Sequence, residues 1–364
     1  MKVTFPQMGT MEIAVKTLLE ELGLEVLPPP KITQKTLDLG VKHAPEFACL
    51  PLKINVGNYI EALEEGADTI IMGGGVGPCR FGYYGEVEKE ILEDLGYDFE
   101  MIILEPIQND WWGFYKKLKL LLTNISLFSL KNAWQKAWAK GKAADNLTQK
   151  VNRIRAYAQD RKLAHKIYEE SLAQLDRAEE IAEIQKIEDD YQNKLNDLPR
   201  RKNFSPLRVG IVGEIYVVLE PAVNFNLEKK LGERGIVVDR SLTLTQWVKE
   251  HLYLGGFKDE ARQEKIKEAA KPYLNHEVGG HGLETIGETV LYAQDNYDGV
   301  IHLSPFTCMP EIIAKSILPG LSKDLDMPVL SITVDEHTGE AGVITRLEAF
   351  VDLLKRNQDK GEVV

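Results

Sequence analysis

The sequence predicts an α/β protein with two parallel-sheet domains and an all-helical insert between them. Three observations support this fold. Short apolar segments alternate with amphipathic ones in the first hundred or so residues, and the same alternation returns near residue 206. The stretch between them is rich in Lys, Ala, Leu, Glu and Gln and poor in glycine and proline. Strands that alternate with helices of this length are typical of parallel sheets with helical crossovers.

In the first half, each predicted strand is followed by a glycine or proline stop or by a segment with helical spacing. The predicted strands are MKVTF, LEVLPPP, DTIIMGG and FEMIIL. The predicted helices are 11–22, 52–65 and 83–95, and Gly23, Gly66 and Gly96 end them.

The second half repeats this design. The predicted strands are LRVGIVGE, GIVVDRS, DGVIHLS and MPVLSITVD, and the predicted helices are 221–231, 284–295, 310–318 and 345–355. The stretch ADTIIMGGGVGPCRFGYY of the first half parallels YDGVIHLSPFTCMPEIIA of the second. This likeness indicates an internal duplication.

These patterns divide the chain into three parts. Residues 1–110 form a first α/β domain, 111–205 a helical insert and linker, and 206–364 a second α/β domain. We expect both α/β domains to be Rossmann-like and to face each other across a cleft, with a ligand site between them.

The composition argues against two classes of function, nucleic-acid binding and membrane binding. The net charge of −12 argues against nucleic-acid binding. No apolar run is long enough to span a membrane, and the N-terminal residues lack the apolar core of a signal peptide. We therefore expect a cytoplasmic protein that binds neither nucleic acid nor membrane.

The three cysteines share one kind of position. Cys79 and Cys308 each follow a predicted strand and precede a predicted helix, and Cys49 also stands just before a helix. The amino end of a helix favours a thiolate through its N–H groups and partial positive charge, and a thiolate binds metal. The wide spacing of the cysteines lets them meet only if the two domains face each other.

Three thiolates without a fourth point to an iron–sulfur cluster with one open iron or to an incomplete zinc site. The alternative is that each cysteine is a small buried apolar residue.

The stretches PEFACLPLKINVGN, GGVGPCRFGYY and HLSPFTCMPE resemble the cysteine loops of the 2-hydroxyacyl-CoA dehydratase superfamily. The resemblance is strongest to the stand-alone CoA protein activases, also called acyl-CoA dehydratase activase-related proteins, and extends to the double-cubane cluster proteins. It spans both α/β halves.

This resemblance implies a 4Fe–4S cluster held by Cys49, Cys79 and Cys308. It also implies a partner, an ATP-dependent activator with an actin-like fold that supplies low-potential electrons in anaerobic metabolism. The chemistry would be dehydratase or reductive, on an acyl-CoA or a small molecule, in a homo- or heterodimer.

Three alternatives remain open. The cluster can be one half of an 8Fe–9S double cubane in a reductase. The chain can be a non-catalytic electron-transfer protein or a scaffold for an activator. A structural zinc site would need a fourth protein ligand.

Other polar residues are candidates for the site. Arg80 would hydrogen-bond the cluster or hold an anionic substrate, and its alternative is a surface or interdomain ion pair. Ser304 would hydrogen-bond the cluster. Glu214, His281 and Glu336 are candidate catalytic groups. Their alternatives are a helix cap at Glu214, a glycine turn around His281 and a partner contact at Glu336, and the neighbouring His337 is a candidate of the same kind as Glu336.

Overall fold

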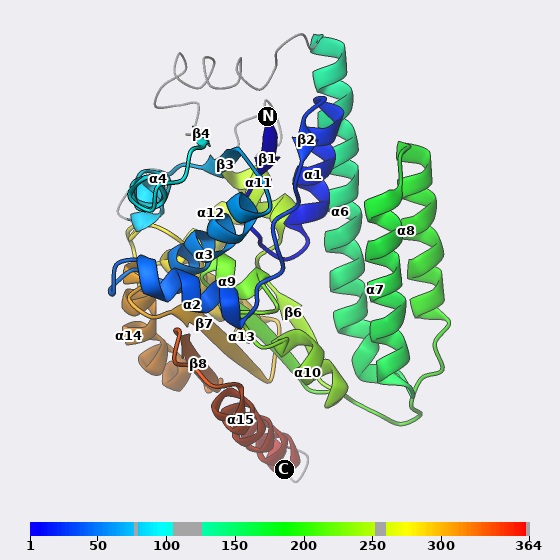
Figure 1. Ribbon diagram of the computed structural model, residues 1–364. Helices are drawn as coiled ribbons and strands as arrows, with labels where there is room; N and C mark the ends of the chain where they lie inside the picture. Colours follow the sequence, from blue (N-terminus) through cyan, green and yellow to red (C-terminus); the bar gives the residue numbers. More distant parts are fainter. Residues whose placement is uncertain (76–78, 105–125, 252–259, 362–364) are drawn as a thin grey trace.

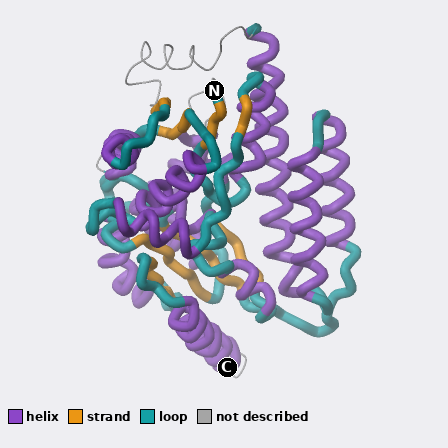
Figure 2. Tube along the Cα trace, viewed as in Figure 1, coloured by secondary structure: helices purple, strands orange, loops and turns teal. Residues whose placement is uncertain are grey.

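The computed structural model describes residues 1–75, 79–104, 126–251 and 260–361. It contains two four-stranded, all-parallel sheets separated in the chain by a helical segment (Figures 1 and 2). The predicted boundary at residue 110 lies outside the described residues. None of the described helices is both long and apolar enough to cross a membrane.

The first sheet has the strand order β2-β1-β3-β4. Its strands are β1 (Lys2–Thr4), β2 (Glu25–Val26), β3 (Thr69–Gly73) and β4 (Glu100–Leu104). Its helices are α1 (Met11–Glu21), α2 (Gln34–His43), α3 (Leu50–Glu64) and α4 (Tyr84–Asp94), and the short 3-10 helix η1 (Arg80–Tyr83) leads into α4. The four predicted strands are confirmed, whereas α2 was not predicted.

The second sheet has the equivalent order β6-β5-β7-β8. Its strands are β5 (Arg208–Gly213), β6 (Val237–Arg240), β7 (Gly299–Pro305) and β8 (Val329–Val334). The helices around it are α9 (Ile215–Leu219), α10 (Leu227–Glu233), α11 (Leu244–His251), α12 (Glu260–Ala270), α13 (Gly282–Gln294), α14 (Met309–Asp324) and α15 (Glu340–Gly361).

Three helix predictions in this half need correction. The predicted helix 345–355 is too short at both ends, because α15 runs from Glu340 to Gly361. The predicted helix 221–231 is wrong in its first part, because a turn with left-handed residues at Phe225 and Asn226 separates α9 from α10. The predicted end at Leu318 is also wrong, because α14 continues to Asp324 with Pro319 inside it.

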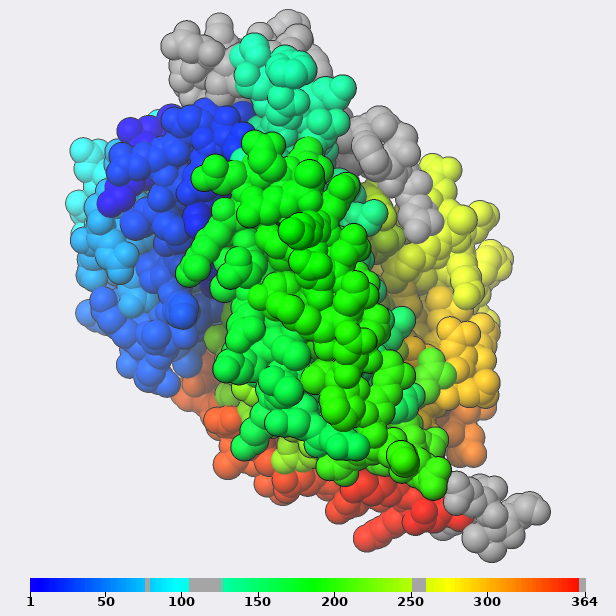
Figure 3. Space-filling view, turned by 90° about the vertical axis from the view of Figure 1, so that its right-hand side faces the viewer, coloured from blue at the N-terminus to red at the C-terminus, as the bar shows by residue number. Residues whose placement is uncertain are grey.

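The described part of the insert consists of α6 (Leu127–Tyr157), α7 (Arg161–Arg177) and α8 (Ile181–Asn196), which confirms its helical character there. Helix α6 contacts both halves: Lys136 pairs with Glu21 of α1, and Asp145 accepts hydrogen bonds from the backbone and hydroxyl of Thr245 in α11. From the side, the insert lies in front of both halves (Figure 3). It therefore fastens the two sheets together.

Helix α3 lies between the two halves, and every residue from Leu50 to Ala62 is buried. Leu50 and Ile54 belong to the core of the second sheet, whereas Leu52 and Val56 belong to the core of the first. A helix that is apolar on several sides is typical of a buried position. Helix α3 therefore joins the two cores.

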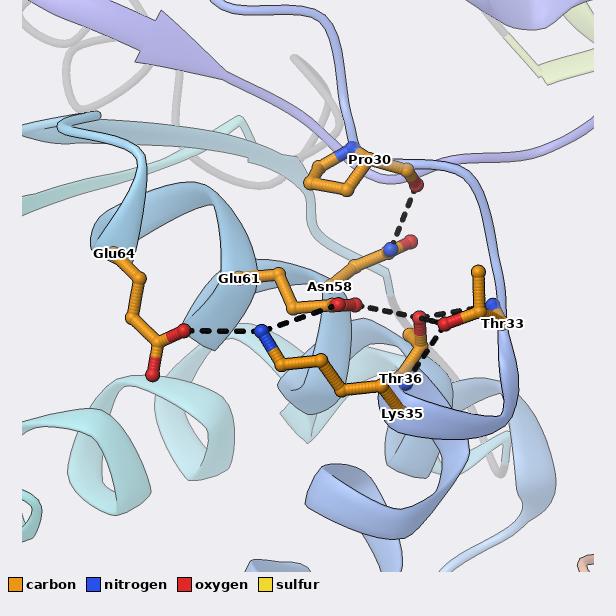
Figure 4. Close-up of polar contacts among 7 residues, drawn as sticks. All are labelled: Pro30, Thr33, Lys35, Thr36, Asn58, Glu61 and Glu64. Atoms are coloured by element: carbon orange, nitrogen blue, oxygen red, sulfur yellow. Dashed lines mark hydrogen bonds and ion pairs between the residues drawn. The ribbon is translucent and has the colours of Figure 1, made fainter.

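Helix α2 packs unusually close to α3, because a glycine of each helix lies against the backbone of the other. A Cβ atom added to Gly57 would lie 1.9 Å from the carbonyl oxygen of Thr36, and one added to Gly40 would lie 1.8 Å from that of Lys53. Polar contacts complete this interface: Thr36 donates to Glu61, and Asn58 donates to the carbonyl of Pro30 (Figure 4).

We predict that Gly57→Ala lowers the free energy of unfolding by about 1–3 kcal/mol, because the new methyl group forces α2 away from α3. The matched control is Gly320→Ala in α14, where nothing lies within 4 Å of the added atom and a gain of about 0.5–1 kcal/mol is expected. Chemical denaturation measures both. Equal stability of the two variants would contradict the close packing of α2 on α3.

Candidate functional site

All three cysteines occupy N-cap positions. Cys49 precedes α3, Cys79 precedes η1 and Cys308 precedes α14. Cys49 and Cys308 are buried, and Cys79 is half-buried. The predicted helix-entry position is therefore confirmed for each, although a helix and a loop, not a strand, precede Cys49.

The cysteines of the two halves come together. Cys49 lies close enough to Cys79 and Cys308 for ionisation of one thiol to affect the pKa of another. The charge of Glu214 raises the pKa of all three. A Cβ atom added to Gly280, in the second half, would lie 3.9 Å from Cys79 Sγ of the first half. The thiols thus share one region between the sheets.

Arg80 ties the three cysteine loops together. Its Nη1 donates to the carbonyl of Phe47 at 2.8 Å, and its Nη2 donates to the carbonyl and hydroxyl oxygens of Thr307 at 2.5 and 2.8 Å. The Thr307 hydroxyl also donates to the Phe47 carbonyl at 3.1 Å. Arg80 therefore links its own loop to the loops of Cys49 and Cys308. The interdomain ion pair is not formed, because Arg80 reaches carbonyl and hydroxyl oxygens and no described acidic side chain.

The electrostatics of the thiols differ from the expectation. Helix N–H groups do reach the sulfur atoms: the amide of Phe81 donates to Cys79, and that of Glu311 donates to Cys308. Burial is nevertheless the larger effect, and the pKa of each thiol is raised above its ordinary value. The expected lowering of the pKa is therefore wrong for the metal-free site, where the thiols keep their protons.

Glu214 is the N-cap of α9. Its carboxylate accepts hydrogen bonds from the amides of Tyr216 and Val217 at 3.1 and 3.0 Å, which confirms the helix-cap alternative. Burial still raises the pKa of Glu214 to about 7, so a large fraction of this group carries a proton at neutral pH.

His281 and Ser304 are two further predicted residues. His281 is buried at the N-cap of α13, after two glycines with positive φ, which confirms the glycine turn. The hydroxyl of Ser304 lies 3.4 Å from that of Thr333 on the neighbouring strand. No described hydrogen bond of the Ser304 side chain reaches a cysteine.

Glu336 forms an ion pair with the buried Lys53 of α3. Although burial opposes this, the hydrogen bond from Lys53 lowers the pKa of Glu336 below its ordinary value. The carboxylate stays ionised near neutral pH and is unsuited to donate a proton. Its neighbour His337 is exposed and uses its backbone N–H in a turn with Asp335.

Two groups at the site were not predicted. The Tyr84 hydroxyl is hydrogen-bonded to Cys49 Sγ. Glu311, one helical turn beyond Cys308, lies 2.9 Å from His302 Nε2 and accepts a hydrogen bond from Thr285 at 3.0 Å. Both Tyr84 and Glu311 stand in the cysteine-containing stretches of the sequence, but nothing in their spacing showed where they would point.

Exposed apolar side chains lie near the cysteines in the chain. Five of them form what we name the apolar rim: Phe47, Tyr83, Phe306, Met309 and Ile312, which are 43 to 72 % exposed. Each lies within four residues of a cysteine in the chain. Clustered exposed aromatic and aliphatic side chains are typical of protein interaction surfaces.

Among the described residues, no group of three or more His, Cys, Asp or Glu side chains is placed to hold one metal ion. A cubane cluster makes a different demand, because each of its thiolates binds a separate iron. The donor set of three thiols near helix N–H groups fits that demand.

Comparison with known proteins adds no relative. No protein-family model matches the chain, and no curated protein matches it.

We predict that Arg80→Lys loosens the cysteine loops, because an ammonium group cannot make the same forked set of bonds. A hydrogen bond contributes about 1.4 kcal/mol net to holding the loops closed, and losing it raises the population of opened loops about tenfold. Alkylation of Cys49 and Cys308 in the metal-free protein, followed by mass spectrometry, should accelerate about tenfold.

The matched control is Arg153→Lys, whose guanidinium pairs with Asp239 between α6 and β6. It should leave the alkylation rates unchanged. Equal rates in wild type and Arg80→Lys would show that Arg80 does not hold the loops.

Proposed function

We propose that the chain is an iron–sulfur protein in which Cys49, Cys79 and Cys308 hold a 4Fe–4S-type cluster between the two α/β halves. The observation that carries this proposal is the set of Arg80 hydrogen bonds, which fixes the loops of Cys49 and Cys308 to the loop of Cys79. A cluster with three thiolate ligands supplies an iron with an open position and a centre that accepts low-potential electrons.

The chain's own residues suit such a group. Backbone amides point at Cys79 and Cys308 and would stabilise thiolate charge. The protons that the thiols carry in the metal-free site would leave when metal binds, as is usual for thiolate ligands. Glu214, with its pKa near 7, can also be neutral beside three thiolates, which limits repulsion.

The activity we propose is reductive or dehydratase chemistry, driven by electrons from an ATP-dependent activator. The resemblance of the cysteine loops to 2-hydroxyacyl-CoA dehydratases motivates this assignment, with an acyl-CoA or another small molecule as substrate. The apolar rim supports a docked partner, since exposed apolar side chains next to the cysteines in the chain suit a protein interface.

Anaerobic purification or reconstitution tests the cluster. We predict about four iron and four sulfide per chain, and loss of most of both in Cys79→Ser, because each thiolate holds one iron. The control Ser316→Ala, exposed on the same helix as the Cys308 cap, should keep the wild-type content.

Other outcomes of this measurement separate the alternatives. About eight iron and nine sulfide in one bridged centre would indicate the double-cubane type. Zinc in place of iron, or no metal at all, would refute the proposal.

A second prediction concerns the partner. Ile312→Glu places a charge in the apolar rim, and burying an unpaired charge in an interface is costly. We expect about a tenfold slower electron transfer from the ATP-dependent activator, measured by the absorbance change of the cluster, with unchanged iron content. Leu353→Glu, at an exposed site on α15, is the control and should transfer electrons at the wild-type rate.

A further inference from the structure

A buried polar face runs inward from Cys49 along α4. Tyr84 and Glu88 are four residues apart on this helix and lie on one face, and both are buried. Tyr84 contacts Cys49 at the outer end. At the inner end, Glu88 Oε1 accepts a hydrogen bond from Asn55 Nδ2 of α3 at 3.1 Å.

Glu88 has unused hydrogen-bonding capacity in this face. Its Oε2, the Oδ1 of Asn55 and the hydroxyl of Tyr216 are buried and have no hydrogen-bond partner among the described residues. Leaving buried polar atoms unpaired costs about 1–3 kcal/mol each. Fold stability does not explain three such atoms near one carboxyl group, because each of them is destabilising. A carboxyl group that binds and releases a proton would use them.

The surroundings of Glu88 favour its neutral form. The described ionisable groups that face it are Tyr59 of α3, Tyr84 of α4 and Tyr216 of α9, and burial raises the pKa of each above its usual range. None of them supplies a positive charge. Burial therefore raises the pKa of Glu88 to about 8, although the Asn55 amide opposes the change.

We propose that Glu88 is a proton-binding residue linked through Tyr84 to the charge of the cysteine site, so that in alkaline solution the site takes up a proton when it accepts an electron. This inference rests on the proposed function, because the electron comes from the ATP-dependent activator. Glu88 touches neither substrate nor cluster in this arrangement and acts through Tyr84.

One electron from the activator makes the cysteine site one unit more negative. Above about pH 8, where Glu88 is ionised before reduction, this charge raises the proton affinity of its carboxylate, which takes one proton from water and becomes a neutral acid. Reoxidation releases the same proton. Tyr84 keeps its own hydroxyl proton throughout.

The first experiment uses the full-length protein without metal, so it does not depend on the cluster. The infrared spectrum of the wild type minus that of Glu88→Gln should show the C=O band of a protonated carboxylic acid at pH 7, and this band should be lost with a midpoint near pH 8, above the pKa of about 7 of Glu214 and Glu284. The exposed Glu90 on the same helix provides the control Glu90→Gln, whose difference spectrum against the wild type should lack this band. Absence of the band from the wild-type minus Glu88→Gln spectrum would overturn the proposal.

The second experiment measures the midpoint potential of the iron-loaded protein against pH. Below pH 8 Glu88 is protonated in both redox states, so the potential should be level. Above pH 8 reduction takes up a proton, so the potential should fall with rising pH by up to about 59 mV per tenfold change in proton concentration. Glu88→Gln should remove this fall, and Glu90→Gln should retain it.

A fall that persists in Glu88→Gln would overturn the link and point to another acid, such as Glu214, which faces Tyr84. A protein that binds no iron would refute the proposed function and the electron step with it. The infrared band separates that failure from a wrong protonation state of Glu88, because it is recorded without metal.

Discussion

The burial of α3 between the two sheets is the constraint on which the rest of the structure depends. Leu50 and Ile54 fill the core of the second half, while other side chains of the same helix fill that of the first. Because Cys49 caps this helix, the position of one thiol is set by the packing of both cores. The ion pair of Lys53 with Glu336 adds a buried charged contact across the same interface, which is costly to separate.

Much of the fold could be predicted from the sequence, because its strands are short apolar runs and its helices end at glycines. Helix α2 was missed, since its segment QKTLDLGVKH is mostly polar and contains Gly40. That glycine makes sense only in the folded protein, where α2 lies against the backbone of α3. Likewise, Pro319 stands in α14 as an exposed residue, a case that local propensity does not anticipate.

The candidate site was predictable to a smaller extent. A cysteine between a strand and a helix is visible in the sequence, so the helix-entry positions could be inferred. The partners of Arg80 are mainly backbone carbonyls of distant loops. Every residue has a backbone carbonyl, so the sequence does not indicate which of them a side chain will reach. The predicted direction of the thiol pKa change was wrong for a related reason. The start of a helix can be recognised from the local sequence, whereas the burial of a thiol depends on how the two halves pack.

The equivalent topology of the halves explains two of the three thiols but not the third. Strands β3 and β7 hold the same place in the two sheet orders, and Cys79 and Cys308 follow them. Parallel strands of this type direct their following loops to one edge of the sheet, so two facing sheets bring these cysteines toward each other. Cys49 instead comes from the helix that both cores share. A small shift of one half relative to the other would therefore displace Cys49 along with one of its two partners, which makes the spacing of the thiols sensitive to the interface. The Arg80 hydrogen bonds oppose such a shift, because they connect the same three loops that carry the thiols.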